Sequence, residues 1–185
     1  MNVQAQPERI WCNGEPFRLY LSEEQIQQRV RELAREISRD YADKVPILIG
    51  VLNGSFIFIA DLMRALEIDC EVDFLKLSSY GDAKVSSGQA KIRKDIDAQL
   101  AGRHVLVVED IVDTGLSVRY LCDLLQAHRP ASLRVVTLLH KAEATRYPVQ
   151  LDYVGFVIPN LFVIGYGLDY GQKGRNLRHL YVLDQ

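Results

Sequence analysis

The sequence predicts an α/β domain built on a mostly parallel, twisted β-sheet flanked by helices. Short apolar runs of strand length alternate along the chain with segments whose apolar residues recur at helical spacing. Parallel neighbours in a sheet need long crossover connections, and these helical segments supply them. The chain has 185 residues, of which 48% are apolar and 25% charged, so we expect one compact unit with a full core.

The N-terminal part carries signals for a hairpin and then a long helix. Asn13-Gly14 lies between apolar residues, which is the pattern of a tight β-hairpin turn. Ser22 followed three residues later by Gln25 forms a capping box, and the apolar residues after it recur on one helical face. We therefore expect a helix from this box to about Tyr41.

The next part of the chain repeats the alternation of strand and helix. Residues 47–52, ILIGVL, are typical of a strand buried on both faces, and the apolar segment 56–66 is typical of a helix. A further strand is expected at residues 70–79. Residues 79–94 are polar, contain two glycines and lack either period, which predicts a mobile loop.

Residues 105–117, VLVVEDIVDTGLS, predict a buried strand, an acidic edge, a tight loop and a helix start. Ser117 is the expected helix cap, because apolar residues follow it at helical spacing. Main-chain N–H groups of residues 113–117 should converge near the helix N-terminus, where a phosphate is favoured, and Gly115 lets the backbone approach it. The loop matches neither nucleotide-binding pattern, G-x-x-x-x-G-K-[ST] or G-x-G-x-x-G.

The acids of this stretch indicate what accompanies the phosphate. Glu109, Asp110 and Asp113 would repel a phosphate unless a divalent cation or sugar hydroxyls lay between them. A phosphorylated ribose with Mg²⁺ supplies the phosphate together with the cation and the hydroxyl groups.

Further strands are expected at residues 133–140, 153–158, 162–164 and 179–183. The loops after the strands at 47–52, 105–112 and 133–140 should face one crevice, since ligands bind beyond the carboxyl ends of parallel strands.

Charge and composition narrow the class of ligand. The net charge of −2 and pI near 6.1 give no footprint for nucleic acid, and no basic run indicates a membrane surface. The apolar region 47–66 is interrupted by polar residues, so a cytoplasmic protein with a small-molecule ligand is expected. The three cysteines lack zinc-ligand spacing and are expected to be reduced core residues.

Several motifs together resemble a known family. Residues 105–117 resemble the phosphoribosyl diphosphate signature of the type I phosphoribosyltransferases. Lys141, the run FVIGYGLD at 162–169 and Arg175 are similar to the hypoxanthine and hypoxanthine-guanine enzymes rather than to the adenine, orotate or uracil enzymes. The resemblance runs from about Leu21 to the C-terminus. It implies one domain, 1–185, with a core at about 22–165, a small hood from about 1–21 and 166–185, a mobile loop at about 79–94, and assembly as a homodimer or homotetramer.

The resemblance also implies a role for individual residues. Glu109 and Asp110 match the acidic pair that holds the ribose hydroxyls directly or through Mg²⁺, and Asp113 matches the proposed general acid/base at purine N7. Lys141 matches the donor to the 6-oxo group, and Phe162 the aromatic that stacks on the base. The other matches are Leu52, Asn53 and Gly54 in the diphosphate loop, Ser79 and Tyr80 in the closing loop, Ile111, Thr114, Gly115, Leu116 and Ser117 at the phosphoribosyl group, Val163 at the base edge, Asp169 beside a second Mg²⁺, and Arg175 at diphosphate.

Two positions depart from the family pattern. Asn53 stands where many members carry Lys, so a role of that charge toward diphosphate or a neighbouring subunit is not carried over. Leu116 stands where some members have Lys, although its main-chain amide can still serve the phosphate. Neither departure removes a proposed catalytic group.

The implied activity is Mg²⁺-dependent transfer of the 5-phosphoribosyl group from phosphoribosyl diphosphate to N9 of hypoxanthine and guanine, giving IMP and GMP. Two alternatives stay open: an enzyme that prefers xanthine, and a non-catalytic regulator that senses phosphoribosyl diphosphate or nucleotide. The sequence favours the enzyme, because Asp113, Lys141, Asp169 and Arg175 are all present and no DNA-binding segment or basic stripe accompanies them.

Overall fold

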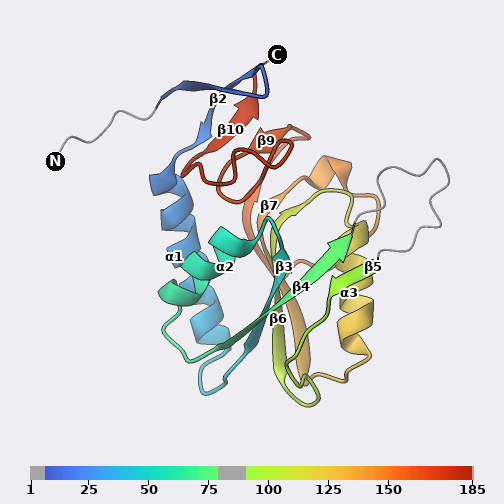
Figure 1. Ribbon diagram of the computed structural model, residues 1–185. Helices are drawn as coiled ribbons and strands as arrows, with labels where there is room; N and C mark the ends of the chain where they lie inside the picture. Colours follow the sequence, from blue (N-terminus) through green and yellow to red (C-terminus); the bar gives the residue numbers. More distant parts are fainter. Residues whose placement is uncertain (1–6, 79–90, 185) are drawn as a thin grey trace.

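The computed structural model describes residues 7–78 and 91–184. Its central sheet has six strands in the order β5-β4-β3-β6-β7-β8 (Figure 1). Five of them are parallel, and β5 pairs antiparallel with β4 at one edge. This confirms the predicted mostly parallel sheet. The strands are β3 (Ile47–Leu52), β4 (Glu71–Ser78), β5 (Lys91–Lys94), β6 (His104–Val112), β7 (Ser132–His140) and β8 (Tyr153–Val157).

Helices cover both faces of this sheet. Helices α1 (Glu23–Asp40) and α2 (Phe56–Ala65) lie on one face and α3 (Leu116–Gln126) on the other, and a short 3₁₀ turn (Ala142–Ala144) follows β7 (Figure 1). Successive residues of β6 alternate between two cores: Leu106 and Val108 pack with α1 and α2, and Val105 and Val107 pack with α3. Burial on both faces explains why these strands are continuously apolar.

The helix starts follow the sequence signals at α1 but not at α3. The Ser22 hydroxyl accepts from the Gln25 N–H at 3.3 Å and the Gln25 side chain accepts from the Ser22 N–H at 2.9 Å, which confirms the capping box. The expected cap at Ser117 is wrong. Gly115 is the N-cap of α3, with a φ of 84°, so the helix begins at Leu116 and Ser117 lies in its first turn.

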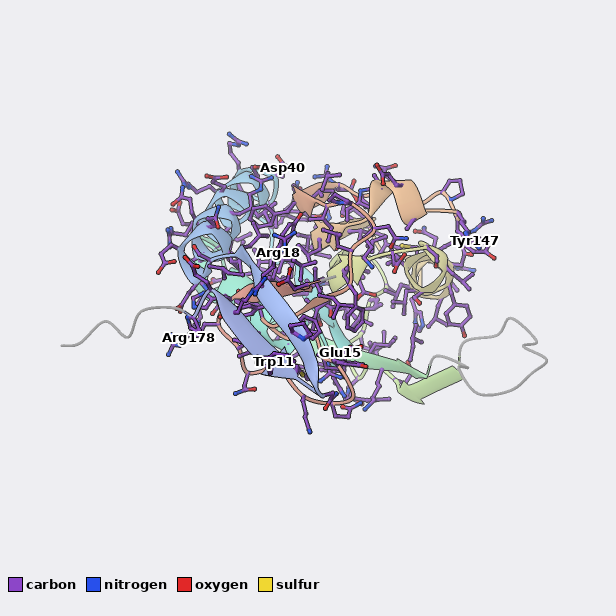
Figure 2. The ribbon with its side chains drawn as sticks, turned by 90° about the horizontal axis from the view of Figure 1, so that it is seen from above. Trp11, Glu15, Arg18, Asp40, Tyr147 and Arg178 are labelled. Atoms are coloured by element: carbon purple, nitrogen blue, oxygen red, sulfur yellow. The ribbon has the colours of Figure 1, made fainter. Side chains whose placement is uncertain are left out.

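Both ends of the chain meet in a second, antiparallel sheet, the hood. Its order is β1-β2-β10-β9, formed by β1 (Arg9–Cys12), β2 (Glu15–Leu21), β9 (Val163–Ile164) and β10 (Leu180–Leu183). The Asn13-Gly14 turn of the predicted hairpin has positive φ at both residues, 51° and 84°. Because β9 belongs to this sheet, the hood begins slightly before residue 166. Seen from above, the hairpin with the exposed Trp11 lies on the opposite side of the molecule from Tyr147 (Figure 2).

Three further expectations concern the loop at residues 79–94, the state of the cysteines and the presence of a membrane-spanning helix. Residues 79–90, with Ser79 and Tyr80, lie outside the described residues, and the last residues of the expected loop, 91–94, form strand β5. All three cysteines are free, with Cys12 buried and the other two partly buried. Among the residues of 7–78 and 91–184, no helix combines the length and apolar character needed to cross a membrane.

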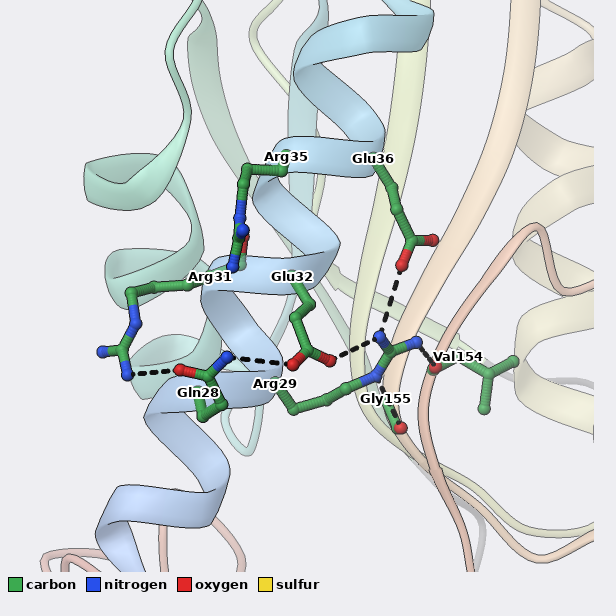
Figure 3. A network of polar contacts seen from close by, with 8 residues as sticks. All are labelled: Gln28, Arg29, Arg31, Glu32, Arg35, Glu36, Val154 and Gly155. Atoms are coloured by element: carbon green, nitrogen blue, oxygen red, sulfur yellow. Dashed lines mark hydrogen bonds and ion pairs between the residues drawn. The ribbon is translucent and has the colours of Figure 1, made fainter.

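One polar network joins α1 to the outer strand β8 (Figure 3). Arg29 donates to the carbonyl oxygens of Gly155 at 2.9 Å and Val154 at 2.8 Å. Its guanidinium also pairs with Glu32 at 3.0 Å and Glu36 at 3.3 Å. β8 is an edge strand of the central sheet, and Arg29 links its backbone to α1 through these two carbonyl groups.

Candidate active site

Two adjacent carboxylates mark the C-terminal end of β6. Glu109 is only 6% exposed, and burial, reinforced by the charge of Asp110, raises its pKa well above the ordinary range. Burial likewise raises the pKa of Asp110 to about 6, although backbone N–H groups and Arg175 partly offset it. Gly54, in the loop after β3, packs directly on this carboxylate, because a Cβ atom there would collide with Asp110 Oδ2. Glu109 is therefore buried and Asp110 half-buried, and nearby positive charge does not fully offset the cost of ionising the pair.

The donor chemistry of the acidic pair fits a divalent cation. Carboxylate oxygens are hard ligands of the kind that Mg²⁺ and Ca²⁺ take, and a bound cation would relieve the cost of burying Glu109 and Asp110 in ionised form. Among the described residues, no three His, Cys, Asp or Glu side chains gather as a metal cluster. Asp169 thus forms no three-residue cluster with the acidic pair.

The loop at residues 113–117 connects β6 to α3 through a tight turn. Gly115 is required by shape, because its φ is 84° and a Cβ atom would collide with the carbonyl oxygen of Tyr147. The Thr114 carbonyl accepts from the N–H groups of Arg146 and Tyr147, both at 3.0 Å. The segment after β7 therefore fixes this loop. The Leu116 N–H donates to the Thr114 hydroxyl at 3.4 Å, and the start of α3 is the kind of helix N-terminus that favours an anion.

A buried lysine meets the third carboxylate of the motif. Lys141, at the end of β7, places its Nζ 3.2 Å from Oδ2 of Asp113, with the lysine side chain 10% exposed and the aspartate 49%. The Lys141 N–H donates to Val112 at 2.9 Å, and the Thr145 hydroxyl lies 3.1 Å from the Asp113 carbonyl and 3.2 Å from that of Lys141. No sequence motif includes Thr145, whose contact with Asp113 spans 32 positions.

The loop after β3 and the segment after β9 lie against each other. The Leu52–Asn53 peptide bond is cis. Gly167 packs on the Gly54 carbonyl so closely that a Cβ atom would collide with it, and Arg175 donates to the Gly167 carbonyl at 2.9 Å. Arg175 also pairs with Asp169 at 2.6 Å. Residues 52–54, Asp169 and Arg175 are thus brought to one place next to the acidic pair.

Aromatic rings of the hood surround Phe162. This side chain is 43% exposed, with its ring centroid 5.3 Å from that of Tyr170 and 6.1 Å from that of Phe17. Val163 is buried and pairs with Val182 of β10, so its main chain is fixed. Tyr170, to which no sequence pattern assigned a role, meets Phe162 edge to face at 82°.

The remaining predicted residues occupy supporting positions. Ile111 packs partly buried against the core beneath α1 and α2, and the Leu116 side chain is 43% exposed. Three surface hollows of about 330 to 500 Å³ lie beside α1 and α2, the second of them reaching the segment 176–178, and beside α3. The candidate site lies at the edge of the sheet between core and hood, where the carboxyl end of β6 meets residues 52–54 and Arg175.

The parallel sheet with an acidic pair at the end of β6, beneath an antiparallel hood, has the architecture expected of a phosphoribosyltransferase, and the comparisons with known proteins show this class. Residues 20–171 match the phosphoribosyl transferase domain, and the chain belongs to that family. Within it the chain falls among the hypoxanthine-guanine enzymes. It is 44% identical over 166 residues to the hypoxanthine-guanine phosphoribosyltransferase of Bacillus subtilis, covering 90% of this chain and 92% of that protein. The Mycobacterium avium enzyme is 45% identical over 186 residues, covering 97% and 91%.

Solved structures agree with this placement. A crystal structure of hypoxanthine-guanine phosphoribosyltransferase from Bacillus anthracis superposes with a TM-score of 0.85 at 43% identity, covering 90% of this chain and 98% of that chain. Hypoxanthine phosphoribosyltransferase from Trypanosoma cruzi gives a TM-score of 0.84 at 45% identity, covering 90% and 94%. Enzymes of this family work with a divalent metal.

Proposed function

We propose that the protein transfers the 5-phosphoribosyl group of phosphoribosyl diphosphate to N9 of hypoxanthine or guanine in purine salvage. The observation that carries this proposal is the contact between Lys141 and Asp113, 3.2 Å apart at the ends of two neighbouring strands. A buried ammonium is a donor only, so it selects a base with an oxygen at the 6-position. A half-exposed carboxylate beside it can take the proton at N7.

The phosphoribosyl group would be held by the acidic pair and the 113–117 loop. Glu109 and Asp110 would accept hydrogen bonds from the ribose hydroxyls and hold Mg²⁺, while N–H groups from Thr114 to Ser117 bind the 5′-phosphate. Asp169 would hold a second Mg²⁺. When bound, the metal neutralises charge on the diphosphate. The two buried carboxylates with raised pKa values support this assignment, because they lack enough positive charge of their own.

The chemical step is attack of N9 on C1′ as the bond to diphosphate breaks, through an oxocarbenium-like transition state. Arg175 would contact the leaving diphosphate, whose charge grows as the bond breaks, so this contact strengthens in the transition state. Asp113 accepts the proton that the base loses, and Phe162 stacks on the base. The backbone at Val163 meets the base edge. We further propose a cytoplasmic homodimer or homotetramer.

Steady-state kinetics with four bases test the proposal. With phosphoribosyl diphosphate and MgCl₂, kcat/KM for hypoxanthine and guanine should exceed that for adenine by roughly 10⁴-fold, because the adenine amino group meets a second donor at Lys141. A Lys141→Gln variant should narrow that ratio, since an amide offers an acceptor as well as a donor. Xanthine as the best base would support the xanthine-preferring alternative, and ligand binding without turnover of any base would support a sensor.

A further inference from the structure

A buried hydrogen bond joins helix α2 to the segment after β9. The Tyr166 hydroxyl donates to Oδ2 of Asp61 at 2.6 Å, across 105 positions of the chain. Tyr166 is 3% exposed and the Asp61 side chain 11%. Asp61 also accepts from the Gln27 side chain of α1 at 2.5 Å and pairs with Arg64. These contacts hold the Asp61 carboxylate in one position between α1 and α2.

Tyr166 stands in a conformation that its own backbone disfavours. It precedes Gly167 in a two-residue turn between Gly165 and Leu168, which exchange N–H···O bonds of 3.0 and 2.9 Å. The φ of Tyr166 is 46°, and bulky residues rarely adopt positive φ without an outside constraint. The hydrogen bond to Asp61 supplies such a constraint.

The same turn forms part of the wall of the candidate site. Gly167 follows Tyr166 directly, packs on the Gly54 carbonyl and accepts from Arg175 at 2.9 Å. Its N–H in turn donates to the Arg175 carbonyl at 2.9 Å. Any shift of this turn would therefore move both the 52–54 loop and the arginine that we assign to diphosphate.

We infer that Asp61, acting through the Tyr166 hydroxyl, is a positioning residue for the diphosphate part of the site. The inference rests on the proposed roles of the 52–54 loop and Arg175. Neither Asp61 nor Tyr166 needs to touch a substrate for this. The expected consequence is selective: affinity for diphosphate and phosphoribosyl diphosphate depends on the contact, whereas recognition of the base, at Lys141 and Phe162, does not.

The Tyr166→Phe variant removes the hydroxyl and keeps the ring. Loss of a hydrogen bond to a charged acceptor should raise the KM for phosphoribosyl diphosphate roughly fivefold to thirtyfold, with a similar rise in the Kd of diphosphate measured by calorimetry with MgCl₂. The KM for hypoxanthine should stay within about threefold of wild type. Unchanged diphosphate affinity, or an equal rise in both KM values, would overturn the inference.

The chain offers a matched control pair. Tyr153 of β8 donates to Asp40 at the end of α1 at 2.7 Å, and this pair is also partly buried. Asp40 lies across the molecule from the hood hairpin (Figure 2). Tyr153→Phe should lower the Tm to a degree comparable with Tyr166→Phe while leaving both KM values and the diphosphate Kd unchanged. If it weakened diphosphate binding equally, the effect would be one of general stability and the inference would fail.

Two further variants separate the possible failures. Combining Asp61→Ala with Tyr166→Phe should weaken diphosphate binding no more than the stronger single change, because each substitution removes one partner of the same hydrogen bond; additive effects would contradict action through that contact. Arg175→Gln tests the underlying site independently. If it weakens diphosphate binding while Tyr166→Phe does not, only this inference is wrong; if it too has no effect, the proposed diphosphate site is wrong.

Discussion

Replacing Asp110 by Asn should stabilise the ligand-free protein at neutral pH and abolish its activity. Burial raises the pKa of this carboxyl from its ordinary 3.8 to about 6, although hydrogen bonds with backbone N–H groups and Glu109 act to lower it. Holding it ionised therefore costs about 3 kcal/mol at neutral pH. The Asn side chain lacks that charge but gives up part of the hydrogen bonding from backbone N–H groups, so a gain of about 1–3 kcal/mol, or roughly 3–10 °C in Tm, is expected.

The stability difference between Asp110→Asn and the wild type should depend on pH. The folded protein binds the Asp110 proton more tightly than the unfolded chain does, so the cost is full above about pH 6 and fades as the pH falls toward about 4. The advantage of the variant should fade over the same range. Thermal unfolding in EDTA at about pH 7.5, 6 and 4.5 measures it. With MgCl₂ and phosphoribosyl diphosphate, the wild type should gain stability and the variant should not.

Asp73 of β4 provides a control of opposite sign. Burial acts to raise its pKa, but hydrogen bonds from the backbone N–H groups of Ala98, Phe74 and Asp97 outweigh burial and lower it. Asp73→Asn should therefore destabilise the protein at neutral pH. A variant of Asp110 that is less stable than wild type in EDTA at about pH 7.5, or an advantage that persists unchanged at about pH 4.5, would refute the reasoning.

Three other predictions concern single contacts. Asp113→Asn should lower kcat roughly 10²-fold or more with phosphoribosyl diphosphate binding largely kept, and near-wild-type single-turnover rates would exclude a general-base role. Gly115→Ala should both destabilise the protein by about 1–3 kcal/mol and reduce affinity for phosphoribosyl diphosphate, because the methyl group collides with Tyr147; unaltered affinity in calorimetry would contradict this. Arg29→Met should cost about 2–3 kcal/mol in urea unfolding and leave kcat/KM unchanged, and altered kinetics would show that β8 is coupled to the site.

The sequence predicted the core sheet and the main site motif because both are local. Strands buried on both faces are continuously apolar, and the capping box at Ser22 depends on a residue only three positions away. The start of α3 was misplaced, since Ser117 fits the cap preference, whereas the chain turns into the helix through Gly115 two residues earlier. Nothing local distinguishes these two starts, because the choice depends on how closely Tyr147 approaches the loop.

Contacts between distant segments were not predictable in the same way. Lys141 and Asp113 were each identified through motifs, but their 3.2 Å approach follows from adjacent strands that end side by side. Thr145 and Asp61 belong to no motif, because each acts on a segment remote in sequence. Their roles can be recognised only in the folded structure, where β7 lies beside β6 and α2 contacts the hood.

The position of β10 in the hood determines at what stage of folding the site can be completed. This last strand lies between β2 and β9, and the Leu183 N–H donates to the Phe162 carbonyl at 3.0 Å. During translation the chain emerges from its N-terminus, so the acidic pair and Lys141 can assemble while the hood still lacks its inner strand. A nascent chain interrupted before residue 180 would hold the sheet together yet leave Phe162 unanchored. The Phe162 side of the surface that we assign to the base therefore forms only after β10 has paired with β9, whereas the Lys141 side forms with the sheet.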